Sequence, residues 1–291
     1  MTTWTLQDIP WHRFDPGRVD ATVLTLAKSA SLVESNSDDY GRYLRQVFAG
    51  DASWCAVIER WAAEEVQHGL ALRRWCELAD PSFDFAQAFE RFTAKIRLPD
   101  GSAGSVRGSR TGELLARCVV ECGTSTYYRS LCDRAQEPVL RSICTRIARD
   151  EFSHYRLFLD QSRRWMQREP ISLLTRLQVV LGRMLEGEDD ELAYAWHCSL
   201  ACAPEYRRRP VLGEYLVASL SVLRQEHLER GLGMAFRAAG ISSSRRIMGM
   251  AGTLAMRLVR LRIRSLASAA PKARVRAGGR VRPPWPRVLT A

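Results

Sequence analysis

Apolar residues recur along this chain at the three- and four-residue spacing of amphipathic helices, and no stretch alternates as a half-buried strand would. A first helical pattern runs from Arg18 to about Ala49, and a second runs from an N-cap at Asp51 to about Ala79. The apolar face of the first pattern consists of Val23, Leu26, Ala27, Ala30 and Val33. The short link between the two patterns predicts an antiparallel helical hairpin.

A second hairpin is predicted further along the chain. Thr111 is placed to cap a third long helix that runs to about Glu137, and Pro138 is placed to open a fourth helix that ends near Arg168. Pro170 follows the fourth helix and prevents its continuation. Four long helices in two hairpins predict an all-α four-helix bundle.

The two predicted hairpins are separated by a long crossover connection. Residues 83–97 predict a shorter helix within it, and residues 98–109 form a connection rich in Gly and Ser. Additional C-terminal helices are expected over residues 171–187, 188–203 and 209–239, with breaks at Gly187, Pro204 and Pro210.

Charge is distributed unevenly along the chain. The whole chain carries a net charge of +11, but residues 241–291 hold 12 basic residues and no acidic ones, so residues 1–240 are close to neutral. Within the basic part, residues 245–266 predict a cationic amphipathic helix, suited either to an anionic lipid surface or to ordinary packing as a terminal helix. The remaining tail is expected to be disordered when free.

The faces of that basic helix differ in character. Its arginine face consists of Arg246, Arg257, Arg260 and Arg264. Its apolar side, interrupted by Arg262, consists of Ile247, Ala251, Leu254, Leu258 and Leu261. Together with the helical pattern, the charge predicts four parts: an arm (1–17), a bundle (18–170), helices packed on the bundle (171–240), and a basic helix with a disordered tail (241–291).

The cysteines and the apolar runs restrict the location of the protein. None of the eight cysteines forms a Cys-x-x-Cys pair, so no iron–sulfur or zinc-ribbon module is expected. The first residues are too polar for a secretory signal, and no run of about 18 apolar residues lacks charge. These features predict a cytoplasmic protein with free thiols, soluble or peripheral at a membrane.

Four of the predicted helices carry a set of residues typical of metal ligands. In chain order the set is Glu, Glu-x-x-His, Glu, Glu-x-x-His. A Glu and a His three positions apart point to the same side of a helix and can hold one metal ion. Two such pairs and two single glutamates form the ligand set of a carboxylate-bridged two-metal site. The six predicted ligands are Glu34, Glu65, His68, Glu121, Glu151 and His154.

The spacing of the six residues strengthens this interpretation. Glu34 and Glu121 are 87 positions apart, whereas Glu65 and Glu151, like the two histidines, are 86 apart, as expected for one two-helix unit used twice. A single Glu-x-x-His is most simply a pair of solvated side chains. The whole ordered set lies among apolar residues, where unpaired carboxylates would be costly to bury.

Each Glu-x-x-His pair is preceded by another acid. Metal-bound imidazoles usually donate their second N–H to a carboxylate, which fixes the orientation of the ring. Asp150 is the better candidate for such a contact, and Glu64 is equally explained as a solvated residue.

The sequence resembles the acyl-ACP desaturases, a soluble branch of the ferritin-like di-iron carboxylate proteins, over roughly residues 4–165. WAAEEVQHG (61–69) and IARDEFSH (147–154) are similar to their two ligand motifs, and Glu34 is followed six positions later by Tyr40 as in their first ligand helix. Glu121-x-x-Thr124 is similar to their third ligand and its active-site threonine.

The resemblance implies a ferritin-like fold and specific roles for two further residues. Thr124 would be a catalytic residue that helps to deliver protons, although its hydroxyl could instead bond a helix carbonyl one turn back. The arm Trp4-x-x-Gln7-Asp8 resembles the segment whose Trp leads through the motif Asp, here Asp150, to a ligand His. Two iron ions would be the cofactor, and a manganese–iron pair suits the same ligands.

The same resemblance implies a reaction in which reduced iron and dioxygen abstract hydrogen from an unactivated C–H bond. The expected partners are a hydrophobic or acyl substrate, free or on an acyl carrier protein, an external ferredoxin-type electron donor, and a second copy of the chain in a homodimer. Nucleic acid is not expected because the body of the chain has no recognition motif.

The residues leave two other functions open. One is a ferritin-like ferroxidase or peroxidase of the rubrerythrin type, against which the missing cysteine-ligated iron domain argues. The other is a non-catalytic bundle that binds a membrane or a carrier protein. The region after about residue 170 matches the desaturases poorly, so the substrate pocket stays unassigned.

Overall fold

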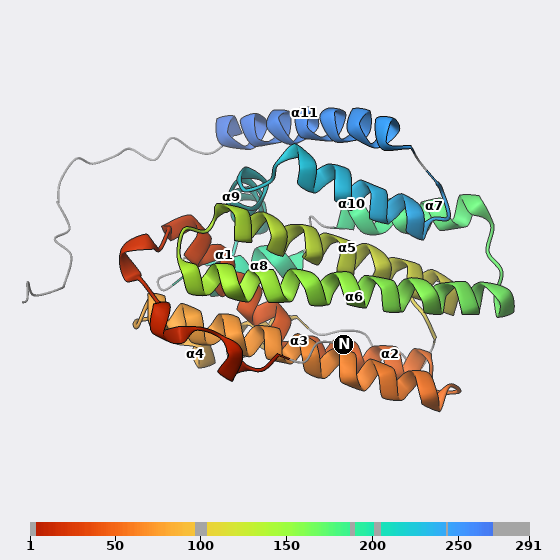
Figure 1. Ribbon diagram of the computed structural model, residues 1–291, viewed down its shortest axis with the longest axis horizontal. Helices are drawn as coiled ribbons and strands as arrows, with labels where there is room; N and C mark the ends of the chain where they lie inside the picture. The colour runs from red at the N-terminus through yellow and green to blue at the C-terminus, as the bar shows by residue number, and fades with distance from the viewer. Residues whose placement is uncertain (1–3, 97–103, 187–189, 201–204, 243, 270–291) are drawn as a thin grey trace, which may run out of the picture.

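The structure confirms the all-α class. The computed structural model describes residues 4–96, 104–186, 190–200, 205–242 and 244–269, and the regular elements in these ranges are all helical (Figure 1). None of the helices described there is long and apolar enough to cross a membrane.

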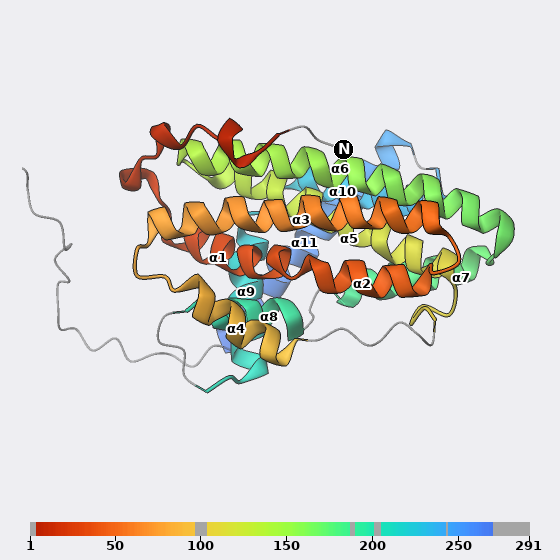
Figure 2. The same cartoon turned by 90° about the horizontal axis from the view of Figure 1, so that it is seen from below.

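A four-helix bundle forms the centre of the molecule. Its helices are α1 (Ala21–Ser35) continued by α2 (Ser37–Val47), α3 (Ala52–Ala79), α5 (Arg110–Arg134) and α6 (Pro138–Arg168). The segment α1–α2 lies along α3 and α5 lies along α6, so each predicted hairpin is present (Figure 2). The expected single helix over 18–49 is wrong in one respect, because it is interrupted at Asn36.

Capping residues explain most of the helix boundaries. Asp51 caps α3 as predicted, with its Oδ1 accepting a hydrogen bond from Trp54 N at 3.0 Å. The predicted cap at Thr111 is wrong: Ser109 caps α5 by accepting a bond from Gly112 N, and the Thr111 hydroxyl donates to the Glu169 carbonyl oxygen. α5 ends before Glu137 because the Glu137 carboxylate caps α6.

The crossover between the hairpins contains α4 (Phe85–Lys95), close to the predicted helix over 83–97. α4 is packed against the bundle through the buried residues Phe85, Ala88 and Phe92. Part of the Gly/Ser-rich connection that follows it lies outside the described residues.

Further helices cover one side of the bundle. They are α7 (Leu173–Leu185), α8 (Asp190–Cys198), α9 (Arg208–Ser221), α10 (Gln225–Ala238) and α11 (Arg245–Ala269). α10 lies on α5, and α11 lies outside α10 and α9 (Figure 1).

Two expectations about these helices are corrected. The expected single helix over 209–239 is two helices, because the chain turns at residues 222–224. Pro210 does not break α9, since it lies in the first turn, where its missing N–H costs nothing. The predicted breaks at Gly187 and Pro204, and the tail from residue 270 onward, lie outside the described residues.

The N-terminal arm is a series of three 3₁₀ turns, η1 (Leu6–Asp8), η2 (Trp11–Arg13) and η3 (Pro16–Arg18). It lies along the outside of α6, where Trp4 and Ile9 are buried. The division of the chain into an arm, a bundle, packed helices and a basic end stays a prediction.

Two glycines bring α1 and α2 close to α3. A Cβ atom at Gly69 would lie 2.7 Å from Ser35 N and 2.4 Å from Ser35 Oγ, and a Cβ atom at Gly41 would lie 2.9 Å from Ala62 Cβ. Only glycine permits this approach without displacement. Because Ser35 follows Glu34, the contact at Gly69 also positions the first predicted ligand.

Candidate metal centre

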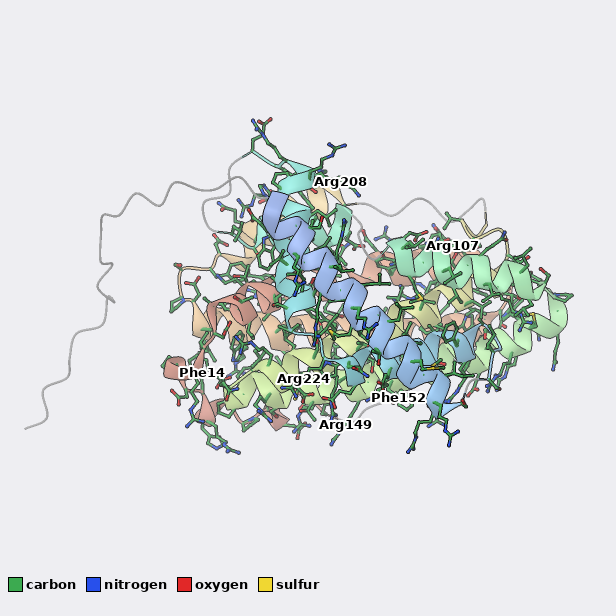
Figure 3. The ribbon with its side chains drawn as sticks, turned by 90° about the horizontal axis from the view of Figure 1, so that it is seen from above. Phe14, Arg107, Arg149, Phe152, Arg208 and Arg224 are labelled. Atoms are coloured by element: carbon green, nitrogen blue, oxygen red, sulfur yellow. The ribbon has the colours of Figure 1, made fainter. Side chains whose placement is uncertain are left out.

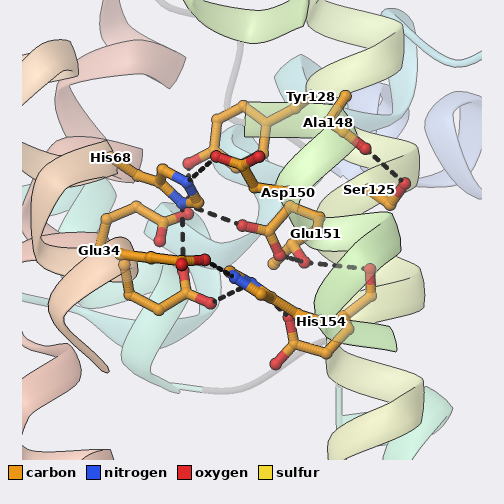
Figure 4. A network of polar contacts seen from close by, with 12 residues as sticks. Glu34, His68, Ser125, Tyr128, Ala148, Asp150, Glu151 and His154 are labelled. Atoms are coloured by element: carbon orange, nitrogen blue, oxygen red, sulfur yellow. Dashed lines mark hydrogen bonds and ion pairs between the residues drawn. The ribbon is translucent and has the colours of Figure 1, made fainter. Parts of the chain in front are cut away.

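The structure brings all six predicted ligands together in the middle of the bundle (Figure 4). Glu34 comes from the end of α1, while one Glu-x-x-His pair comes from α3 and the other from α6. Each of the six side chains belongs to a residue that is at most 6% exposed. On α3 the ligands lie between Trp61 and Trp75, whose rings belong to two separate apolar clusters. The ligands of α3 therefore lie between two apolar clusters, each with a buried tryptophan.

The ligand atoms form two overlapping groups, each with its atoms within 4.8 Å of one another. The first group consists of Glu34, Glu65, His68 and Glu151, and the second of Glu65, Glu121, Glu151 and His154. Glu65 and Glu151 belong to both groups, so they are placed to bridge two ions. Glu34 and Glu121 are placed to bind one ion each, as in a bridged dicarboxylate site.

Several ligand atoms have no hydrogen-bond partner although they are fully buried. These atoms are Glu65 Oε1, His68 Nδ1, Glu121 Oε2, Glu151 Oε1 and His154 Nδ1. Some of these atoms lie close together without forming a hydrogen bond. For example, His154 Nδ1 is 3.0 Å from Glu65 Oε1, but the geometry is not that of a hydrogen bond. Buried polar atoms are normally paired, because an unpaired one costs about 1–3 kcal/mol. Five unpaired ligand atoms around one space fit metal binding.

The other imidazole nitrogens are held by the acids that precede the ligand pairs. His68 Nε2 lies 3.1 Å from Asp150 Oδ2, and His154 Nε2 lies 2.8 Å from Glu64 Oε2. Each acid thus contacts the histidine of the opposite pair. Glu64 is in contact with an imidazole and is not merely solvated. Both rings present Nδ1 to the ligand space, the orientation that metal binding requires.

The arm reaches this site through Trp4. Its Nε1 donates to Asp150 Oδ2 at 2.6 Å, and its ring is stacked parallel to His68 with 6.0 Å between the centroids. Gln67 Nε2 donates to the Trp4 carbonyl oxygen at 3.0 Å. The predicted connection from Trp4 through Asp150 to His68 is therefore present as a chain of contacts.

Thr124 lies one turn after Glu121 on α5 and is half-buried. Its hydroxyl donates to Glu151 Oε2 and also lies 3.2 Å from the carbonyl oxygens of Val120 and Glu121. The hydroxyl contacts both a predicted ligand and the helix backbone, and the role of Thr124 in delivering protons stays a prediction.

Sequence reasoning missed two residues on α5 that bond to the ligands. Arg117 Nη2 donates to Glu121 Oε1 at 3.0 Å, and its guanidinium lies between Tyr40 and the Trp61 ring. Tyr128 donates its hydroxyl hydrogen to Glu34. Their spacing was the available signal, because positions four before and seven after Glu121 share its helix face.

Burial and crowding shift the protonation of the ligands. Burial raises the pKa of Glu34 and of Glu121 well above the usual range, and the neighbouring carboxylates of Glu65 and Glu151 raise both further. Burial would lower the pKa of His68, but the neighbouring carboxylates of Asp150, Glu151 and Glu65 raise it well above its ordinary value. Without metal, the cluster therefore retains protons that cations would displace.

A third group of candidate ligands, Asp133, Glu226 and His227, differs from the first two. His227 Nδ1 accepts a hydrogen bond from Arg224 N, and His227 Nε2 lies 2.9 Å from Asp133 Oδ2. Both ring nitrogens have protein partners, so this histidine caps α10 and connects it to α5.

Comparison with known proteins agrees with this geometry. A family model described as Fatty acid desaturase matches residues 39–187, more than half of the chain. The match includes five of the six predicted ligands and begins five residues after Glu34. No curated protein matches the chain. The chain belongs to the fatty acid desaturase family, a family of the ferritin-like di-iron superfamily.

Proposed function

We propose that the protein is a di-iron oxidoreductase that uses dioxygen to desaturate or hydroxylate an acyl-type or other hydrophobic substrate. Membership of the desaturase family supports an oxidoreductase in general. The observation that carries the finer proposal is the pair of buried ligand groups that share Glu65 and Glu151. Two ions in this donor set would supply the activation of dioxygen that oxidation of an unactivated C–H bond requires.

The residues around the ligands have distinct tasks in this proposal. Glu65 and Glu151 would be available to both ions, and Asp150 and Glu64 hold the imidazoles in register. The Thr124 hydroxyl bonds a bridging carboxylate and can pass a proton at that oxygen. The burial of the ligands excludes water, which protects reactive species from side reactions.

Electrons would enter along the contacts that lead from Trp4 through Asp150 to His68. Trp4 is 7% exposed and its ring lies against His68, so it connects the arm to the buried site. No cluster-binding cysteine motif is present in the chain, so the electrons come from an external donor of the ferredoxin type.

Metal stoichiometry after selective loss of ligands tests the proposal. Protein reconstituted anaerobically with ferrous iron is expected to hold about two ions per chain and to consume dioxygen. Glu65→Gln removes a ligand common to both groups and is expected to bring iron below one per chain, whereas Glu121→Gln should leave about one. Glu90→Gln, at an exposed residue of α4, serves as the matched control and should leave iron content unchanged.

Three outcomes would change the conclusion. Purified protein that binds no iron and consumes no dioxygen after reduction is no di-iron oxidase. Stoichiometric ferrous oxidation without conversion of any acyl substrate supports a ferroxidase. A manganese–iron pair found by metal analysis retains the site and changes the cofactor.

A further inference from the structure

The C-terminal helix α11 has two apolar faces, and only one of them packs on the protein. On the inner face, Met256 is buried, and a Cβ atom at Gly252 would lie 2.2 Å from Glu229 Cγ on α10. Near the two ends of the helix, Met248 reaches Gly233 of α10 and Leu266 reaches Gly213 of α9. α11 is therefore attached to the body along most of its length, and its orientation is fixed.

The outer face of α11 carries a row of large apolar residues that no described part of the chain covers. Each is between 50% and 67% exposed. The row, called here the outer stripe, consists of Ile247, Met250, Leu254, Leu258 and Leu261. It spans about 21 Å at the rise of an α-helix. Figure 3 views the molecule from this side and shows α11 in front of the other helices. A continuous exposed row of this kind indicates a binding surface.

Arginines border the outer stripe. Arg246, Arg257, Arg260 and Arg264 follow one edge of it, and Arg262 lies beyond the other edge. α11 contains six arginines and no acidic residue. An apolar row with a cationic border is the arrangement of helices that lie in a membrane interface, where side chains enter the acyl region and arginines bind anionic headgroups.

We propose that the outer face of α11 docks the protein onto an anionic lipid surface. The apolar row would insert to the depth of the headgroups, and the arginines would pair with lipid phosphates. Attachment is peripheral. The proposal does not depend on the reaction at the metal centre.

The arginines that border the outer stripe favour a membrane over the other possible partners of this face. In a second copy of the chain, a facing α11 would bring two arginine rows together without an acid on either helix to offset them. An acidic carrier protein would satisfy the arginines, but five large apolar residues in one line offer a flat surface that suits a bilayer. Residues 1–240, close to neutral, contribute little attraction by themselves.

Vesicle co-sedimentation of the full chain tests the proposal. Binding is expected to vesicles of phosphatidylcholine with about one third phosphatidylglycerol, to be much weaker with phosphatidylcholine alone, and to fall as salt rises. Leu254→Asn with Leu258→Asn is expected to reduce the partition coefficient at least tenfold without altering the helical circular dichroism. Leu78→Asn, at an exposed leucine of α3 on the opposite side of the molecule, is the matched control.

A second pair of variants isolates the charge. Arg257→Gln with Arg264→Gln should weaken binding to anionic vesicles about tenfold or more and reduce its salt dependence. Arg60→Gln with Arg156→Gln removes the same charge from exposed positions on α3 and α6 and should retain binding. Equal losses in both pairs would mean that only net charge matters and would overturn a specific docking face.

Two further results would also overturn the proposal. One is failure of the unaltered chain to bind anionic vesicles. The other is a dimer, seen by light scattering, that the two asparagine substitutions separate while vesicle binding is absent, since the stripe would then be a contact between copies. Binding to an acidic carrier protein in place of vesicles would likewise reassign the face.

Discussion

At the scale of single residues, the site is defined as much by the partners of the ligands as by the ligands. Asp150 and Glu64 each take one imidazole nitrogen and leave the other facing the ligand space. Arg117 acts in the same way on a carboxylate: it occupies Glu121 Oε1 and leaves Oε2 without a partner. This arrangement favours binding of Glu121 to an ion through one oxygen only.

Replacing Arg117 with Met is therefore expected to change one iron site and not the other. With Oε1 released, Glu121 can bind its ion through both oxygens, so Mössbauer spectra of the loaded protein should show one altered iron environment. The metal-free variant should lose about 1–3 kcal/mol of unfolding free energy, because a buried carboxylate loses its charged partner. Arg60→Met is the control at an exposed arginine. Identical spectra for the variant and the unaltered protein would show that Arg117 does not set the binding mode.

At the scale of helices, the sequence predicted the hairpins well because local signals and ligand spacing agreed. Asp51 and Pro138 mark helix starts in a way that depends only on neighbouring residues. The interruption at Asn36 lies in a run of six polar residues, 34–39, that the prediction had placed within one helix. Beside it, α1 meets α3 at Gly69, where the two backbones come too close for a side chain, a contact between distant residues that the local pattern does not show.

Substitution of Gly69 with Ala tests this contact. The new methyl group would meet Ser35 at 2.4–2.7 Å, so α1 would have to move and take Glu34 with it. Overpacking lowers the free energy of unfolding by about 1–3 kcal/mol, and the higher helix propensity of alanine offsets up to about 1 kcal/mol of this loss. We expect a net loss of about 1–2 kcal/mol in urea unfolding, together with weaker iron binding.

The matched control for this contact is Gly182→Ala on α7. A Cβ atom there meets nothing within 4 Å, so the variant should be unchanged or slightly more stable. A Gly69→Ala variant as stable as this control, with full iron content, would mean that the close approach has no role in placing Glu34.

The packing of α11 is another feature that the local sequence pattern does not determine. The sequence shows arginines on one side and apolar residues on the other, but a helix with two apolar rows does not reveal which row meets the body. In the structure the row with Gly252 and Met256 packs inward and the row with Leu254 and Leu258 faces outward.

At the scale of the whole molecule, the bundle buries six ionisable side chains close together, where bound cations would balance the charge of the carboxylates. Glu34, Glu121, His68 and His154 all have a pKa raised by burial or by their neighbours, so at neutral pH the metal-free cluster carries protons. Ligation requires ionised carboxylates and neutral imidazoles, so each ion must displace protons. Metal binding must therefore strengthen as pH rises, until the raised pKa values are passed.

The pH dependence of metal binding can be measured directly. Anaerobic titration calorimetry with ferrous or manganous ions, in buffers of different ionisation enthalpy, should show proton release at pH 7. The affinity is expected to fall about tenfold per pH unit for each displaced proton as pH drops from 8 to 6. Glu121→Gln removes one of the groups with a raised pKa, so it should reduce both the number of protons released and the slope. An affinity independent of pH over this range, with no proton release, would mean that the ligands already have the protonation states that ligation requires and that the cluster does not store protons in the absence of metal.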